Sequence, residues 1–148
     1  MNKQITWIFF LSLFFIQQVN AQDKFLSLKN NKVNVRFGPS MDYPIKYIYK
    51  KLNLPVKLID KKDNFRRIID LNNNSGWIHW TQLKKPNSII ILEDEILFKR
   101  SSNFSKPILR LKKGRLLVIK KCKEEWCNVM TENYSGWLKV DNVWGKTN

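Results

Sequence analysis

The chain has 148 residues, of which 27 are Lys or Arg, 12 are Asp or Glu and one is His, so its formal net charge is +15. The single histidine, His79, excludes a metal site built on two histidines and leaves one candidate for a His-based catalytic dyad. Neither a glycine-rich phosphate loop nor a Gly-x-Ser-x-Gly motif occurs. We therefore expect no enzyme: no catalytic residue, no cofactor and no metal.

Residues 1–21 have the pattern of a cleavable signal peptide. Lys3 supplies the positive start, an apolar run extends from Ile5 to Ile16, and Val19-Asn20-Ala21 places small residues at the cleavage point. Cleavage after Ala21 would place the mature protein in the periplasm or outside the cell. The alternative is an uncleaved N-terminal anchor, but the run is shorter than the roughly 20 residues of a membrane span. No later stretch predicts a transmembrane segment in the mature chain.

The mature chain is strongly basic, because the loss of Lys3 lowers the net charge only from +15 to +14. Such a charge favours an anionic partner, such as the anionic polymers of the cell envelope. The alternative is a compositional bias toward Lys, Asn and Ile, with lysines scattered over solvated turns and strand ends. Export argues against a nucleic-acid partner, although the charge alone would permit one.

The first half of the mature chain, residues 22–84, predicts a series of short strands. In one of them Val33 and Val35 alternate with Asn34 and Arg36, which is typical of a half-buried strand. The turn at residues 38–40 ends this strand, because proline fixes its own φ and restricts the residue before it. The expected strands are residues 25–28, 33–36, 45–49, 54–60, 65–70 and 76–80, and a short turn is expected at 81–83.

The second half, residues 88–145, repeats this plan after a short linker at residues 84–88. The linker is too short to separate the halves, so we expect them to touch. The clearest repeat is Ser75-Gly76-Trp77-Ile78, which returns 60 residues later as Ser135-Gly136-Trp137-Leu138. Strand-prone runs occur at residues 89–92, 96–99, 107–108, 115–121, 126–131 and 136–138. Many short strands with polar turns predict an all-β protein of two tandem small β-barrels.

The segment Asn34-Val35-Arg36-Phe37-Gly38-Pro39-Ser40, followed by Gly76-Trp77-Ile78, resembles the bacterial Src-homology-3-like domains. The second half, where Cys122 and Cys127 precede Gly136-Trp137-Leu138, is similar to the second repeat of the tandem secreted members of Gram-negative bacteria. The resemblance implies a small barrel used as a binding module, commonly one that holds cell-wall enzymes on peptidoglycan. The second copy is more divergent, since Lys99-Arg100-Ser101-Ser102 replaces the Arg-x-Gly-Pro-Ser element.

Several residues are expected to have structural roles. Trp77 and Trp137 are interpreted as core or barrel-closing residues rather than ligand contacts. The same structural interpretation covers the residues of the two motifs, Gly38, Pro39, Gly76 and Gly136.

Cys122 and Cys127 flank what should be a hairpin tip, where facing residues lie within disulfide range. An oxidising compartment favours this bond. A redox-active pair is the alternative, but the spacing is not Cys-x-x-Cys.

Four aromatic residues have no clear counterpart in the other half: Tyr43, Tyr47, Tyr49 and Trp80. Rigid aromatic side chains with a polar tip commonly line grooves for extended peptides or glycans, so these four are candidate ligand-binding residues. The alternative is that they are ordinary half-buried strand residues. Arg36 is a further candidate, with a hydrogen bond to the backbone of the following loop as its alternative role. The acidic run at residues 93–95 is a weak candidate for a calcium-like surface site, because adjacent carboxylates on a strand point to opposite faces.

The resulting hypothesis is a non-catalytic, exported binding module for a peptidoglycan component or for a peptide of an envelope partner protein. Electrostatic association with anionic envelope surfaces is the alternative hypothesis.

Overall fold

The computed structural model describes residues 23–145. The first unit contains β1 (Phe25–Leu28), β2 (Val33–Arg36), β3 (Ile45–Tyr49), β4 (Pro55–Lys62), β5 (Phe65–Ile69), β6 (Ser75–His79), the 3-10 turn η1 (Trp80–Gln82) and β7 (Leu83–Lys84). The second contains β8 (Ser88–Ile91), β9 (Glu95–Phe98), β10 (Pro107–Leu111), β11 (Leu116–Lys123), β12 (Trp126–Thr131), β13 (Tyr134–Lys139) and β14 (Val143–Trp144). The predicted signal peptide and its cleavage site lie outside the described residues.

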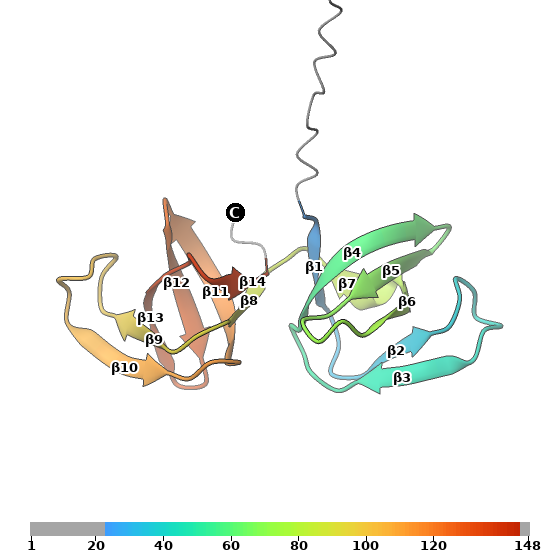
Figure 1. Cartoon of the computed structure of the whole chain (residues 1–148), viewed down its shortest axis with the longest axis horizontal. Helices are drawn as coiled ribbons and strands as arrows, with labels where there is room; N and C mark the ends of the chain where they lie inside the picture. The colour runs from blue at the N-terminus through green and yellow to red at the C-terminus, as the bar shows by residue number, and fades with distance from the viewer. Residues whose placement is uncertain (1–22, 146–148) are drawn as a thin grey trace, which may run out of the picture.

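The two units lie side by side, with β1, β8 and β14 next to the junction (Figure 1). Their strand orders are β3-β2-β6-β5-β4-β1-β7 and β10-β9-β13-β12-β11-β8-β14, so adding seven to each strand number of the first sheet gives the second. The prediction of an all-β protein with two tandem units is therefore confirmed.

Each seven-stranded sheet is open rather than closed into the barrel that we expected. In the first unit the end strands β3 and β7 do not pair with each other. β7 has only two residues, and both Leu83 and Lys84 pair with β1. So short a strand cannot also bridge to the opposite edge of the sheet. The second unit is open in the same way, between β10 and β14.

The two shortest strands have no counterpart among the sequence predictions. We expected a turn at residues 81–83 and a linker from residue 84, whereas the chain forms η1 and then β7. Similarly, β14 pairs with β8 near the end of the described chain. Two-residue strands are too short to display alternation, so no periodic signal marks them.

The duplication extends to the turns and irregularities. In each unit a two-residue loop joins a long hairpin, closed by the pairs Lys62–Phe65 and Lys123–Trp126. The first loop residue has a positive φ in both units, 46° at Asp63 and 54° at Glu124. This conformation matches the tight turns that fit the right-handed twist of paired strands.

Each unit has its own hydrophobic core, built from the inward-facing residues of its strands. The first core contains Leu28, Val33, Val35, Val56, Ile68 and Ile78, all fully buried. The second contains Ile89, Ile91, Leu97, Leu111, Leu117, Cys127, Val129 and Leu138. The predicted alternation is observed in β2, where Val33 and Val35 are buried and the residues between them are not.

Polar contacts fix the junction between the units. The hydroxyls of Ser27 and Ser88, both fully buried, lie 3.0 Å apart. Ser88 also donates a hydrogen bond to the backbone carbonyl of Asn53. The Asn87 backbone N–H donates to Ser27 Oγ over 3.1 Å. The linker therefore forms part of a packed interface, as its short length predicted.

An aromatic contact completes the junction. Trp144 of the second unit lies edge-on to Phe25 of the first, with their ring centroids 5.0 Å apart. Its indole Nε1 donates a hydrogen bond to the carbonyl of Pro55 over 3.0 Å. These contacts fix β14 against the start of the chain's first sheet.

Candidate ligand-binding cleft of the first unit

A row of three large side chains crosses the outer face of the first sheet. Arg36 on β2 and Arg67 on β5 are both register partners of Trp77 on β6, the strand between them. Register partners place their side chains on the same face of a sheet. Trp77 therefore has an arginine on each side.

This row forms part of a cleft of about 290 Å³, which we call the basic cleft. It is lined by Arg36, Phe37, Lys46, Arg67, Ser75, Gly76 and Trp77. Lys46 Nζ donates a hydrogen bond to the Ser75 carbonyl over 2.8 Å and lies 5.7 Å from the centroid of the Phe37 ring. The Phe37 side chain is 60% exposed. The cleft thus combines three cations with an exposed aromatic ring.

The charge of the basic cleft is not neutralised within the described residues. Arg36, Lys46 and Arg67 form no ion pair there, and no carboxylate lines the cleft. Asp60 is the register partner of Arg67 across β4 and β5, yet the two side chains form no ion pair. Cations gathered without counter-charges repel one another, and an anion bound between them relieves that repulsion.

Of the five candidate ligand-binding residues, only Arg36 lines the basic cleft. Its guanidinium Nη1 also donates to the backbone carbonyl of Tyr43 over 2.7 Å, so it holds the following loop as well. The Tyr43 side chain is 47% exposed and lies over Gly38, where an added Cβ would be 2.5 Å from the ring. Pro39, the residue after this glycine, is half-buried.

Trp80 belongs to a separate, smaller cleft of about 170 Å³. The other residues that line it are Leu26, Arg66, Leu83 and Lys84. Trp80 is 51% exposed and lies in η1. The structure therefore does not bring Trp80 together with Arg36.

Tyr47 and Tyr49 pack against the first core rather than lining the basic cleft. Their rings meet edge-on at 5.2 Å, and the Tyr49 hydroxyl donates to the Asp70 carboxylate over 3.0 Å. Burial raises the pKa of both phenols, and the nearby charge of Asp70 raises the pKa of each further. Asp70 in turn accepts the backbone N–H groups of Asn72 and Asn74, which shapes the loop before β6.

The expected core positions of Trp77 and Trp137 need correction, since both side chains are half-buried. Successive side chains of a strand point to opposite faces. Because Ile78 and Leu138 fill the two cores, the tryptophans before them lie on the outer faces.

Gly76 and Gly136 are positions where neighbouring strands approach closely. A Cβ on Gly76 would lie 2.4 Å from Val35 Cγ1, and one on Gly136 would lie 2.7 Å from the Phe98 carbonyl oxygen. Only a residue without a side chain fits these strand crossings.

The positions of the second unit that correspond to the three cations of the basic cleft carry no charge. The row that corresponds to Arg36, Trp77 and Arg67 consists of Phe98, Trp137 and Asn128. Phe98 and Asn128 are the register partners of Trp137. Lys46 occupies the irregularity between β2 and β3, and Ile108 occupies the corresponding place between β9 and β10. All three cations of the basic cleft are therefore replaced by neutral residues in the second unit.

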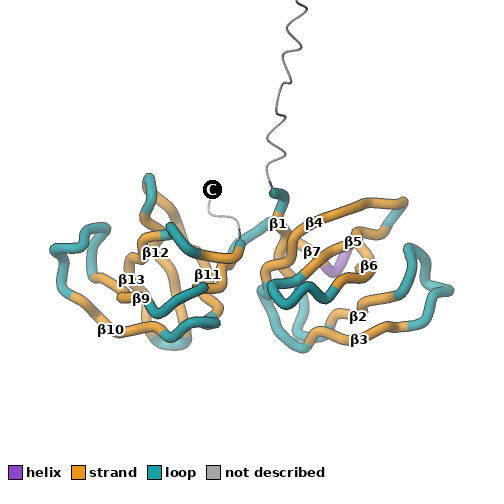
Figure 2. Tube along the Cα trace, in the orientation of Figure 1, coloured by secondary structure: helices purple, strands orange, loops and turns teal. Residues whose placement is uncertain are grey.

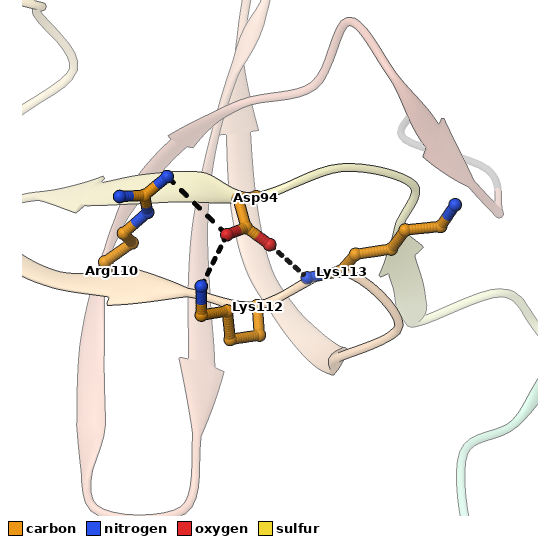
Figure 3. A network of polar contacts seen from close by, with 4 residues as sticks. All are labelled: Asp94, Arg110, Lys112 and Lys113. Carbon is orange, nitrogen blue, oxygen red and sulfur yellow. Dashed lines mark hydrogen bonds and ion pairs between the residues drawn. The ribbon is translucent and has the colours of Figure 1, made fainter.

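The second unit has a different cleft, of about 460 Å³, whose lining is largely apolar. It is formed by Asp94, Ile96, Pro107, Ile108, Leu109 and Arg110. Asp94 accepts hydrogen bonds from Lys112 Nζ over 2.8 Å and from the Lys113 backbone N–H over 3.0 Å, and Arg110 lies 3.6 Å away (Figure 3). The hydrogen bond from Lys112 lowers the pKa of Asp94. Because Asp94 already pairs with Lys112 and Arg110, a calcium site at residues 93–95 is disfavoured.

A disulfide joins Cys122 and Cys127, which confirms the predicted pairing. The two cysteines face each other near the tip of the β11–β12 hairpin. Such a bond fits an oxidising compartment. Within residues 23–145 the structure contains no helix that has the length and apolar character of a membrane span.

Comparison with known proteins identifies the domain type. The model of the bacterial SH3 domain family matches residues 29–85 and again residues 96–145. No match was found among curated proteins. Two solved structures from Trichomonas vaginalis, NlpC2 and NlpC1, share 13% and 12% sequence identity with the chain, each with a TM-score of 0.39. The alignments cover 84% of this chain but 48% and 46% of theirs, so it spans about half their length. The two family matches, which together include most of the described residues, show that the chain belongs to the bacterial SH3 domain family and carries the domain twice in tandem.

Proposed function

We propose that the protein is a non-catalytic, exported binding module that recognises a peptidoglycan component or a peptide of an envelope partner protein through its first unit. The basic cleft is the observation that carries this proposal. It places Arg36, Lys46 and Arg67 around an exposed aromatic ring, without counter-charges among its lining residues. Wall peptides and partner peptides both offer carboxylates beside apolar groups, which such a surface can hold.

Export is part of the proposal. The disulfide near the hairpin tip supports an oxidising location, and the family is associated with the cell wall. The pattern of residues 1–21 supports the same assignment. N-terminal sequencing of the secreted protein should find Gln22 as the first residue.

Electrostatic association with anionic envelope polymers is the second candidate function, and the net charge of +15 favours it. The two candidates differ in their salt dependence. Charges spread over a solvated surface are screened within about 8 Å at physiological ionic strength. Contacts inside a cleft are screened less, so recognition by the basic cleft should survive added salt.

The test is co-sedimentation of the mature protein with purified peptidoglycan sacculi, at low and at about physiological salt. We expect pelleting at both, and a loss of pelleting in the Arg67→Asn variant. Lys61→Asn, which removes the same charge outside the cleft, is the matched control and should pellet normally. Pelleting that vanishes with salt in all three proteins would support the electrostatic candidate. An absence of pelleting at either salt would leave an envelope protein as the partner, to be sought by crosslinking.

A further inference from the structure

We propose that the basic cleft is a site for a carboxylate carried on an apolar organic stem, such as the free C-terminal end of a peptide, and that only the first unit has this site. This inference rests on the proposed function and names the chemistry of the ligand. It is carried by the arrangement of the cations, by the aromatic ring beside them and by the contrast with the second unit.

The cations of the cleft suit a planar oxyanion. Only six of the chain's 27 cationic residues are arginines, and two of those six, Arg36 and Arg67, are in the basic cleft. A guanidinium group offers parallel N–H donors that match a carboxylate, whereas a lysine acts as a point charge. A surface that is basic only through compositional bias would be expected to carry lysines in the basic cleft rather than two of the six arginines.

Two of the three cations are held in position before any ligand arrives. Arg36 donates to the Tyr43 carbonyl over 2.7 Å, and Lys46 donates to the Ser75 carbonyl over 2.8 Å. Each keeps further N–H donors for a ligand. Fixing these long side chains in advance lowers the entropy that binding must supply.

The remaining lining favours a carboxylate on an organic stem over a bare phosphate. Phe37 is 60% exposed beside the cations, and the half-buried indole of Trp77 lies between the two arginines in the register. An inorganic anion gains nothing from these apolar faces, whereas a side chain or backbone next to a carboxylate can pack on them.

The second unit provides an internal negative control. Its counterparts of Arg36, Lys46 and Arg67 are Phe98, Ile108 and Asn128. Ile108 Cδ1 lies 2.8 Å from where a Cβ on Gly136 would stand, so its side chain extends over the strand crossing. Because the same backbone carries both sets of residues, the substitutions Lys46→Ile and Arg67→Asn are compatible with the fold.

The experiment titrates the mature protein with three probes, followed by NMR of the backbone amides and by calorimetry. The probes are an N-acetylated Phe-Ala dipeptide with a free C-terminal carboxylate, the same dipeptide with a C-terminal amide, and inorganic phosphate. We expect the acid to shift the amide signals of residues 36–37, 46, 67 and 75–77. We expect the amide and phosphate to bind at least tenfold more weakly, and signals of the second unit to stay unchanged.

The variants locate the contact. Lys46→Ile and Arg67→Asn should each weaken binding of the acid at least fivefold, whereas Lys61→Asn should change it less than twofold. Equal binding of acid and amide, or phosphate binding as tight as that of the acid, would overturn the proposal. Equal losses in Lys61→Asn would overturn it too, because net charge would then explain the binding. These readouts do not involve sacculi, so the two proposals can fail separately. Binding of the acid without pelleting would support the carboxylate site and contradict peptidoglycan as the ligand. Pelleting without binding of the acid would support peptidoglycan as the ligand and contradict the carboxylate site.

Discussion

The two units share their backbone plan and differ on their outer faces. Strand order, hairpin loops and the irregularity between the second and third strands recur, and each long loop, residues 37–44 and 99–106, lies at a far end of the molecule (Figure 2). The side chains around the Gly-Trp strand that both units share do not recur: two arginines and a lysine in one unit are a phenylalanine, an asparagine and an isoleucine in the other. The strand crossing is therefore common to both units, whereas the row beside the tryptophan differs between them without a change of fold.

The strongest test of this comparison is to add a methyl group at the strand crossing of each unit. Gly136→Ala should lower the free energy of unfolding of the second unit by about 3 kcal/mol, the upper part of the range for overpacking. Its Cβ would lie 2.7 Å from the Phe98 carbonyl oxygen and 2.8 Å from two side chains. Gly76→Ala should cost the first unit less, because its closest contact is a side-chain methyl of Val35. Urea unfolding measures both, and a larger cost at Gly76 would contradict the reasoning.

The disulfide is a second difference between the units, since the positions equivalent to Cys122 and Cys127 are Lys61 and Arg66. Replacing both cysteines by alanine should lower the free energy of unfolding by at least about 2 kcal/mol, the chain-entropy value for so short a loop, because Cys127 also loses buried contacts in the core. The effect should be confined to the second unit. Thermal unfolding followed by NMR, with reduced wild-type protein as a second reference, would separate the units; a matching loss in the first unit would show that the assignment is wrong.

The junction determines whether the units unfold together. Trp144→Phe keeps an aromatic ring against Phe25 but removes the hydrogen bond to the Pro55 carbonyl. A typical hydrogen bond contributes about 1 kcal/mol, so the coupling between the units should fall by that amount. Calorimetry should then resolve two transitions that lie closer together in the wild type. Unchanged transitions in the variant would mean that the buried serines alone hold the junction.

The smallest effect concerns the tyrosine pair, which only the first unit has, since Leu111 occupies the position of Tyr49 in the second. Burial raises the pKa of Tyr49 above its ordinary value, so folding favours the neutral phenol. The resulting stability is fully present below about pH 10, where the unfolded phenol is also neutral, and it is lost as the pH rises further.

Tyr49→Phe should therefore flatten the loss of first-unit stability as the pH rises above about 10. The comparison with wild type in urea unfolding removes the contribution of the lysines, which titrate in both proteins. A variant with the same pH dependence as wild type would refute the role of this phenol.

Much of the fold could be predicted from local patterns. The alternation of Val33 and Val35 predicted β2, and the repeated Gly-Trp motif predicted two copies of one unit. β7 and β14 escaped prediction because two residues show no period. The short strands with polar turns, and the family resemblance as well, predicted closed barrels, whereas the strand pairings leave both sheets open.

The candidate site was harder to predict because it depends on register between distant strands. Arg36, Trp77 and Arg67 come together only through the pairing of β2, β6 and β5. Lys46 reaches the cleft because the register between β2 and β3 shifts at this residue, and no sequence pattern predicts that shift. The lack of a counterpart in the other half made Tyr47 and Tyr49 candidates, but both pack against the core. A position-by-position alignment of the two copies places Asn128 at the position of Arg67, and this difference in charge is the signal in the sequence that marks Arg67.

The open sheets have a consequence for how copies of this protein behave toward one another. β3 and β10 each stand at the end of a sheet, with one side of the backbone unpaired in the described structure. Exposed sheet edges of this kind invite edge-to-edge polymerisation, and charged residues on the edge strand counter it. Lys46 on β3 and Arg110 on β10 are both exposed and carry such charges. Because Lys46 also lines the basic cleft, a ligand that neutralised its charge would remove one barrier to self-association.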